Sequence, residues 1–133
     1  MKGKEFLFGD ITHKIIGLCF NVHAQLGGGL LEKAYQNALA IALKKAEINY
    51  KEQARLPMYY NQTMVDYGYA DFLVDDKIIV EIKRDSNFHI SRIKQVEKYL
   101  VAIQQPIGLL IHFGYEKVYV KRIINRHFFN SQD

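Results

Sequence analysis

The sequence contains few of the residues that build covalently linked or cysteine-bound folds. Cys19 is the only cysteine and tryptophan is absent, so an intrachain disulfide and a zinc site made of several cysteines are both excluded. No segment approaches the roughly 18 consecutive apolar residues of a membrane span. The first residues, 1–5, are not followed by an apolar run of the signal-peptide type. These absences predict a cytoplasmic protein that does not enter a membrane.

A strong excess of one charge is also missing. Eighteen Lys and Arg residues against fourteen Asp and Glu give a formal net charge of +4, which is compatible with an anionic partner without requiring one. A chain of 133 residues that is 49% hydrophobic fits one domain with a real core. We therefore predict a single domain over residues 1–133, with a core at about 11–124 and a loose tail at 125–133.

The order of helical and alternating patterns indicates an α/β fold. Two amphipathic helices separated by Gly27-Gly28-Gly29 are followed by three strands, a helix and two strands. Pro57 favours an edge position for the first strand. The predicted elements span 10–26, 30–46, 50–60, 63–74, 77–84, 91–104, 107–113 and 117–124.

The third predicted strand carries charge where a core strand is usually apolar. It reads Ile78-Ile79-Val80-Glu81-Ile82-Lys83, and residues two apart on a strand face the same side, so Glu81 and Lys83 project together. Charged groups beside a buried strand are costly unless they are paired, hydrated or metal-bound. Taken alone, the two residues are explained most simply as a salt-bridged pair on a solvated face.

Asp71, on the preceding strand, favours a different interpretation. If residues 75–77 form a three-residue loop, Val74 pairs with Ile78, and Asp71 falls opposite Glu81 with the two Cβ atoms about 5 Å apart. The same register sets Tyr69 opposite Lys83. A two-residue loop would instead point the two acids to opposite faces. Like charges in opposed positions are destabilising unless a cation lies between them.

Two carboxylates together with water and a phosphate oxygen suit Mg²⁺ or Mn²⁺. Such a metal would polarise a phosphoryl group and help to generate hydroxide. Lys83 could orient or deprotonate the attacking water and stabilise the developing charge. The carbonyl of Ile82, between the two charged residues, is a further candidate ligand.

These residues resemble those of the PD-(D/E)XK nuclease superfamily. Asp71, nine intervening residues and Glu81-x-Lys83 match the pattern that names it. Gln95-Val96-Glu97-Lys98-Tyr99 is similar to the QxxxY motif of RecB-like members, and Gly29-Leu30-Leu31-Glu32-Lys33-Ala34-Tyr35 spells the signature of the small GxxExxY proteins. The resemblance runs from about residue 11 to 124.

The resemblance implies a restriction-endonuclease-like αβββαβ core, with a mixed central sheet flanked by helices. It also implies that Glu32 is an additional acid of the metal site. Gln95 and Tyr99 lie one helical turn apart and share a face, and the RecB-like pattern implies that they contact substrate or orient the lysine. Related sequences often have Arg where this chain has Tyr69, and Arg84 and Arg92 are the candidates to replace it in contacting phosphate.

Three hypotheses of function follow. The first is a Mg²⁺-dependent nuclease that hydrolyses phosphodiester bonds, of DNA rather than RNA, through Glu32, Asp71, Glu81 and Lys83. The second is a non-catalytic nucleic-acid-binding or assembly module that retains the fold. The third is an interaction protein without a role on nucleic acid. A chain this small has little surface beyond its core for reading a sequence, so action as a homodimer or with a partner protein is expected.

Overall fold

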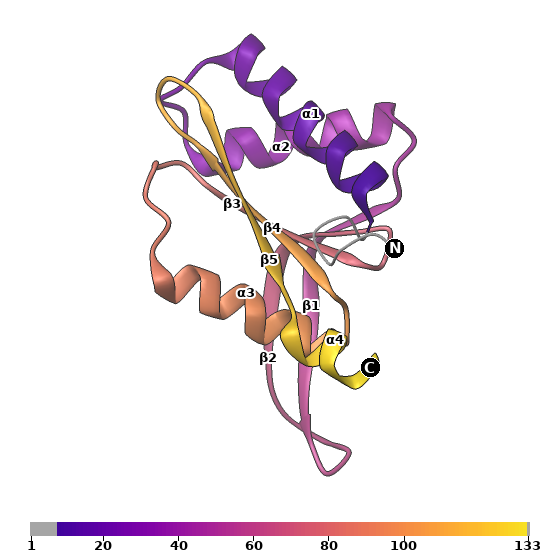
Figure 1. Cartoon of the computed structure of the whole chain (residues 1–133). Helices are drawn as coiled ribbons and strands as arrows, with labels where there is room; N and C mark the ends of the chain where they lie inside the picture. The colour runs from indigo at the N-terminus through magenta and orange to yellow at the C-terminus, as the bar shows by residue number, and fades with distance from the viewer. Residues whose placement is uncertain (1–7, 133) are drawn as a thin grey trace.

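The computed structural model describes residues 8–132 and consists of a five-stranded sheet with helices on both faces (Figure 1). The order of elements agrees with the predicted order, except that a helix is added at the end of the chain. The elements are α1 (Gly9–Leu26), α2 (Glu32–Lys45), β1 (Tyr50–Tyr60), β2 (Thr63–Val74), β3 (Ile78–Lys83), α3 (Ile90–Ile103), β4 (Ile107–Phe113), β5 (Val118–Ile124) and α4 (Arg126–Gln132).

The strands lie in the sheet in the order in which they occur in the chain, β1-β2-β3-β4-β5. Neighbouring strands are antiparallel except for β3 and β4, which are parallel. A parallel pair needs a long crossover connection, and α3 provides it. The sheet is therefore mixed, as predicted, and Pro57 lies on an edge strand.

Each face of the sheet has its own hydrophobic core. α1 and α2 cover one face, where Ile15, Leu39 and the even-numbered residues of β3 pack together. α3 covers the other face, where Val96 and Leu100 pack on Ile79. Because side chains alternate along a strand, Glu81 and Lys83 continue the row of Ile79 on the α3 face. The apolar character of β3 thus comes from burial on both sides.

The connection between β2 and β3 decides the register on which the predicted site depends. Residues 75–77 form the loop, the amide of Lys77 donates to the carbonyl of Val74 over 3.0 Å, and Val74 pairs with Ile78. The expected three-residue loop is therefore confirmed. The ladder ends at the pair Phe72 and Val80, so the expected pairing of Tyr69 with Lys83 is wrong for the described chain: Tyr69 pairs with Arg55 of β1 instead.

The end of the chain differs from the loose tail that we expected at 125–133. Residues Arg126–Gln132 form α4, and Asp133 lies outside the described residues. Asn125 is buried and its amide donates to the carbonyls of Leu100 and Gln105, at 3.2 and 3.0 Å, while its side-chain oxygen accepts from the amide of Phe128. This capping by a buried Asn fixes the start of the helix, and periodicity alone gives little signal for one so short.

Cys19 is fully buried in α1, and burial raises the pKa of its thiol to about 12, so it is a core residue. Among the described residues, no helix is both long and apolar enough to cross a membrane.

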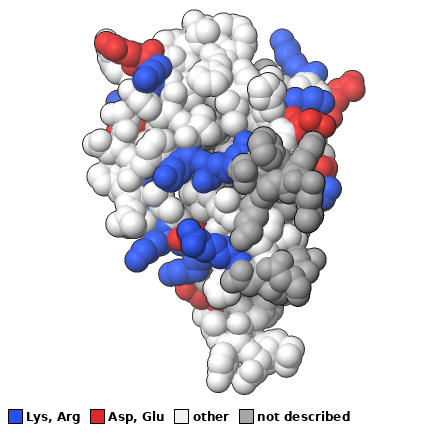
Figure 2. All heavy atoms as spheres, viewed as in Figure 1, with Lys and Arg blue, Asp and Glu red and all other residues white. Residues whose placement is uncertain are grey.

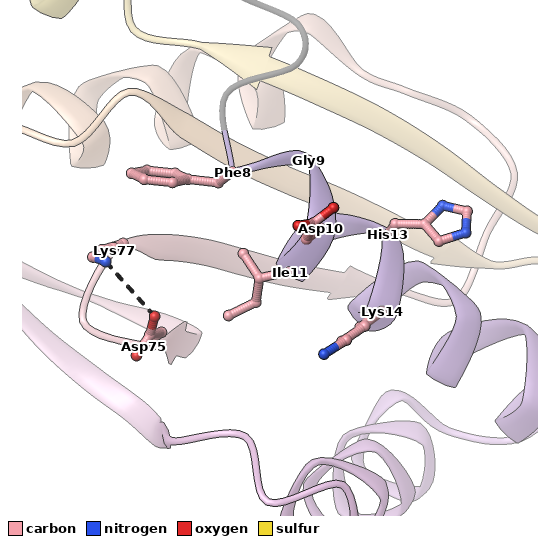
Figure 3. Close-up of a pocket in the computed structure, with 8 residues that line it drawn as sticks. All are labelled: Phe8, Gly9, Asp10, Ile11, His13, Lys14, Asp75 and Lys77. Carbon is pink, nitrogen blue, oxygen red and sulfur yellow. Dashed lines mark ion pairs between the residues drawn. The ribbon is translucent and has the colours of Figure 1, made fainter.

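A hollow of about 870 Å³ lies between the start of α1 and the β2–β3 turn (Figure 3). Asp75 and Lys77 form an ion pair of 3.8 Å on one side of it, and His13 and Lys14 project from α1 on the other. None of the predicted site residues lines this hollow. Asp71 and Glu81 lie at the opposite end of the β2–β3 ladder, just beyond the pair Phe72 and Val80.

Candidate active site

The carboxylates of Asp71 and Glu81 meet where β2 and β3 separate. The amide of Asp71 donates to Glu81 Oε1 over 2.9 Å, and the amide of Ile82 donates to Asp71 Oδ2 over 2.7 Å. Each carboxylate therefore accepts a hydrogen bond from a backbone amide of the facing strand, at a point where the backbones of the two strands no longer pair. The register predicted from the loop brings the two acids together at the end of the ladder.

Glu81 is the most perturbed acid in this part of the molecule. Its side chain is buried, and its pKa is raised to about 8, first by desolvation and then by the charge of Asp71. The hydrogen bond from the Asp71 amide and the charge of Lys83 act in the opposite direction, and Glu32 adds a further rise. A cation bound beside these acids would relieve the repulsion that raises the pKa.

Glu32 is the first residue of α2, and its position depends on the glycine loop that precedes the helix. Gly27 and Gly29 have positive φ angles of 74° and 88°, which favour glycine. At Gly28 a Cβ atom would meet backbone atoms at 2.0 to 2.5 Å, so only glycine fits. The loop thus sets where α2 begins, and the charge of Glu32 acts on Glu81.

Tyr35 fastens this loop to the core. Its ring is fully buried and stacks on Phe113 with centroids 4.5 Å apart. Its hydroxyl donates to the carbonyl of Gly27 over 2.7 Å and accepts from the amide of Leu30 over 3.2 Å. Tyr35 is therefore a structural residue that holds the loop before Glu32, rather than a contact for substrate.

A second set of polar residues, which sequence reasoning missed, contacts Asp71 from the side of α2. Gln53 Nε2 donates to Asp71 Oδ1 and to Gln36 Oε1, both at 3.4 Å, and Gln36 Nε2 donates to Glu52 Oε2 at 3.3 Å. Gln53 has a φ of 45° within β1, an unusual conformation for a residue with a side chain. The three residues form no motif in the sequence; Gln53 contacts Asp71 directly, and Gln36 and Glu52 are connected to it through Gln53 and Gln36.

Lys83 and Tyr99 approach the acids from the α3 side. The charge of Lys83 lowers the pKa of Glu81, and the charges of Glu81 and Asp71 are among the causes that raise the pKa of Tyr99, after desolvation. A backbone hydrogen bond from Tyr69 to the Tyr99 hydroxyl has the opposite effect. Tyr99 is buried, whereas Gln95, one turn earlier on α3, is exposed. Of the two predicted helix residues, Tyr99 is thus the one that contacts β2.

The two arginines considered as phosphate contacts have different surroundings. Arg84 directly follows β3 and is exposed. Arg92 Nη1 forms a 3.0 Å ion pair with Asp85 and also donates to the carbonyl of Asn87. The hydrogen bond from Arg92 is the main cause that lowers the pKa of Asp85 to about 2. Arg92 therefore organises the connection between β3 and α3.

Buried His112 completes this connection. Its Nδ1 lies 2.8 Å from the carbonyl of Asp85 and 3.0 Å from the carboxylate, and its ring packs against Phe88. Desolvation lowers the pKa of the imidazole, so it is neutral near pH 7. His112 pairs with Lys83 in the parallel β3–β4 ladder. Its hydrogen bonds with Asp85 therefore fix the chain two residues after the lysine.

The acids fit a divalent cation that takes oxygen ligands. The two backbone amides bond Asp71 Oδ2 and Glu81 Oε1, so neither amide occupies Asp71 Oδ1 or Glu81 Oε2. The two carboxylates repel one another. Within residues 8–132, however, no group of three or more His, Cys, Asp or Glu side chains is close enough to hold a metal ion. Glu32 thus acts on Glu81 through charge. A cation held here would keep several waters, as Mg²⁺ commonly does.

Comparison with solved structures identifies the class of fold. The crystal structure of SSO0001 superposes with a TM-score of 0.55 at 19% identity, covering 69% of this chain and 48% of that one. The crystal structure of an alkaline exonuclease (LHK-Exo) from Laribacter hongkongensis gives a TM-score of 0.51 at 12% identity, covering 70% of this chain and 55% of that one. This chain therefore matches about half the length of both. The shared architecture is the restriction-endonuclease-like nuclease fold.

The sequence itself identifies the family. Residues 9–123 match the family model described as the PD-(D/E)XK nuclease superfamily, so the chain belongs to that superfamily. No curated protein matches the sequence.

Proposed function

We propose that this protein is a metal-dependent nuclease that hydrolyses phosphodiester bonds, with DNA as its substrate. The observation that supports this most directly is the meeting of Asp71 and Glu81 at the end of the β2–β3 ladder, beside Lys83. The chain belongs to the PD-(D/E)XK nuclease superfamily, and Asp71 followed by Glu81-x-Lys83 resembles the pattern in that name.

The chain's own residues would share the work as follows. Asp71 and Glu81 would hold the cation, Glu32 would add negative charge near it, and the carbonyl of Ile82 would offer a further oxygen. When bound, Mg²⁺ or Mn²⁺ polarises the phosphoryl group and lowers the pKa of a bound water. Lys83 orients the attacking water and stabilises the negative charge that develops on the phosphoryl oxygens.

The finer family assignment is also a proposal, and local geometry supports it. The GxxExxY signature comprises Gly29, whose positive φ angle suits glycine, Glu32 at the start of α2, and Tyr35, whose hydroxyl donates to the carbonyl of Gly27. Each of its three fixed residues thus has a physical role in setting the position of one acid. The QxxxY motif is supported through Tyr99, which contacts the β2 backbone next to the acids.

Positive charge elsewhere on the molecule suits an anionic substrate. Figure 2 shows Lys and Arg side chains gathered in two groups across the middle of the viewed face, over β5 and α3. A hollow of about 370 Å³ between α3 and α4 is lined by Lys94, Lys98 and Arg126, together with Glu97. Such a surface would contact phosphates without reading the sequence, while Arg84 is exposed next to the proposed site.

The proposal is tested by incubating the purified protein with labelled single- and double-stranded DNA and RNA, in Mg²⁺, Mn²⁺ or EDTA. We expect cleavage that requires the metal and is lost in Asp71→Asn and in Lys83→Ala. Calorimetric titration of Mn²⁺ should give a binding isotherm for the wild type that is absent for Glu81→Gln. Cleavage that survives both single substitutions would contradict the proposal. Salt-sensitive binding without any cleavage would instead identify a non-catalytic nucleic-acid-binding module.

A further inference from the structure

In the outer half of the β1–β2 hairpin, one face is not covered by any helix of residues 8–132. The hairpin extends beyond α3 and α4, away from α1 and α2 (Figure 1). On its α3 face, Ala54, Leu56 and Ala70 are buried. On the other face Tyr67 and Tyr69 are 48% and 50% exposed. An exposed patch of aromatic side chains on a sheet face is often a binding site.

An arginine lies among these exposed rings. Arg55 pairs with Tyr69 across the two strands and therefore shares its face. The guanidinium lies over the ring of Tyr67, 4.3 Å from the centroid, and the rings of Tyr67 and Tyr69 meet edge to face at 5.7 Å. We call these three residues, Arg55, Tyr67 and Tyr69, the tyrosine strip. It combines flat aromatic surface with positive charge.

The tyrosine strip leads directly into the candidate active site. Tyr69 lies two residues before Asp71 on β2, although the alternation of side chains is interrupted between them, because Ala70 packs in the α3-side core and Phe72 in the α1/α2-side core. The Asp71 carboxylate is reached from the side opposite α3, since Gln53, which donates to Asp71 Oδ1, also donates to Gln36 of α2. Residues two apart on a strand are roughly 6.6 Å apart. A base stacked on Tyr69 would thus belong to a nucleotide at or next to the one whose phosphate reaches Asp71.

We infer that the tyrosine strip binds the unpaired bases of a single-stranded nucleic acid and guides that strand to Asp71. Stacking on aromatic side chains requires bases that are not held in a duplex, and the arginine beside the rings complements the phosphates. The inference rests on the proposed function, since the strip ends at the proposed catalytic acid. It specifies the substrate as a single strand, or the unpaired end of a duplex.

A second copy of the chain is a less suitable occupant. β1 is an edge strand, and pairing of two edges is the usual way for such a sheet to associate. Pro57 lacks an amide hydrogen, the register shifts between Met58 and Tyr59, and Gln53 has a positive φ. These three features interrupt the regular hydrogen-bonding edge that another strand would need.

The inference is tested by binding, which does not require activity. Fluorescence anisotropy in EDTA would measure the affinity of the full chain for labelled oligo(dT), oligo(U) and a blunt duplex. A single strand carrying 2-aminopurine would report base stacking. We expect the double variant Tyr67→Ala/Tyr69→Ala to bind either single strand at least about tenfold more weakly and to lose the quenching of 2-aminopurine. Binding to the blunt duplex should change little.

Matched variants separate stacking from other effects. Tyr67→Phe/Tyr69→Phe keeps the rings and should retain binding and quenching. Phe20→Ala removes a ring that is 50% exposed on α1 and should bind as the wild type does. Equal binding of single strands by the double alanine variant and the wild type would overturn the inference. So would sedimentation equilibrium showing a dimer that the alanine variant loses, because the strip would then bind a second copy.

The two proposals can fail separately. Tyrosine-dependent binding and quenching in a protein that never cleaves would contradict the nuclease function and leave the strip supported. Metal-dependent cleavage of single strands at the same kcat/KM by the wild type and the double alanine variant would contradict the strip and leave the nuclease function supported.

Discussion

The two halves of the β1–β2 hairpin are made from one continuous pair of strands but have opposite surroundings. In the half next to β3, Phe72 and Val74 are fully buried between helices and neighbouring strands. In the half that extends beyond the sheet, Tyr67 and Tyr69 are about half exposed. Asp71 lies at the boundary, where the ladder with β3 ends. The difference shows how a core strand can present one acid at its edge: the strand is packed on both faces up to that residue and only on the α3 face just beyond it.

The largest effect is expected at the boundary itself. Replacing Asp71 by Asn keeps its size and removes the charge that would bind the cation. Because a catalytic metal contributes several kcal/mol to the transition state, we expect kcat/KM for DNA cleavage to fall at least about 100-fold. The matched control is Asp76→Asn, which removes an exposed acid of the β2–β3 turn that forms an ion pair with Lys51 of β1. If both substitutions lowered cleavage equally, Asp71 would have no special role.

The comparison of burial is tested most directly by stability. Phe72→Ala should lower the free energy of unfolding by about 3–5 kcal/mol, because it leaves a cavity in the core. Tyr67→Ala, five residues earlier on the same strand, should change it by less than about 0.5 kcal/mol, since its ring is half exposed. Urea denaturation of the two variants and the wild type measures this. Similar losses in both variants would mean that the outer half is also packed in solution.

The pH dependence of stability tests the buried acid at the boundary. The pKa of Glu81 is raised from 4.5 to about 8 in the folded chain, so between these values the folded state binds more protons than the unfolded state. Stability should therefore fall as pH rises through this window, with a slope of at most about 1.4 kcal/mol per pH unit from this group. Unfolding of Glu81→Gln in EDTA should lack this fall.

Added Mg²⁺ should reduce the fall in the wild type alone, since a cation stabilises the ionised form of Glu81. If the free energy of unfolding of the wild type rose between pH 5 and 8 in EDTA, folding would not raise the pKa of Glu81.

A small effect on stability, together with slower cleavage, is expected at Gln53 of β1. Gln53→Gly removes the strain of a left-handed backbone, which costs roughly 1 kcal/mol in a residue with a side chain. It also removes two long hydrogen bonds, so the two effects oppose one another and the free energy of unfolding should change by less than about 1 kcal/mol. Cleavage should nevertheless slow, because Asp71 loses the amide that orients it. Glu47→Gly relieves a similar backbone, with φ 59°, at the end of α2. It should leave kcat/KM unchanged, and slowing in both variants would point to a general effect of added glycine.

Much of the fold and part of the site could be predicted because both depend on local signals. Strand β4 has the bounds expected from its apolar run, and the loop at 75–77 fixed the register that brings Asp71 to Glu81. The glycine loop before Glu32 was recognised from its three consecutive glycines. Side-chain periodicity and turn length act over a few residues, so a reader of the sequence can use them.

The missed features depend on contacts between distant segments. Gln53 of β1 contacts both Asp71 of β2 and Gln36 of α2, three residues that are far apart along the chain. Tyr69 was expected to pair with Lys83, but β2 separates from β3 before that point and Tyr99 approaches from α3. The helix at Arg126–Gln132 depends on the burial of Asn125 against the end of α3.

The sequence by itself thus determined the order of elements and the hairpin register that brings Asp71 to Glu81, because alternation and turn chemistry are properties of adjacent residues. Only the tertiary structure decided where the two strands separate, which oxygens of Asp71 and Glu81 remain available, and which face of the hairpin stays uncovered. These outcomes follow from how helices pack on the sheet. The spacing of residues along the chain does not show how segments far apart in it pack together.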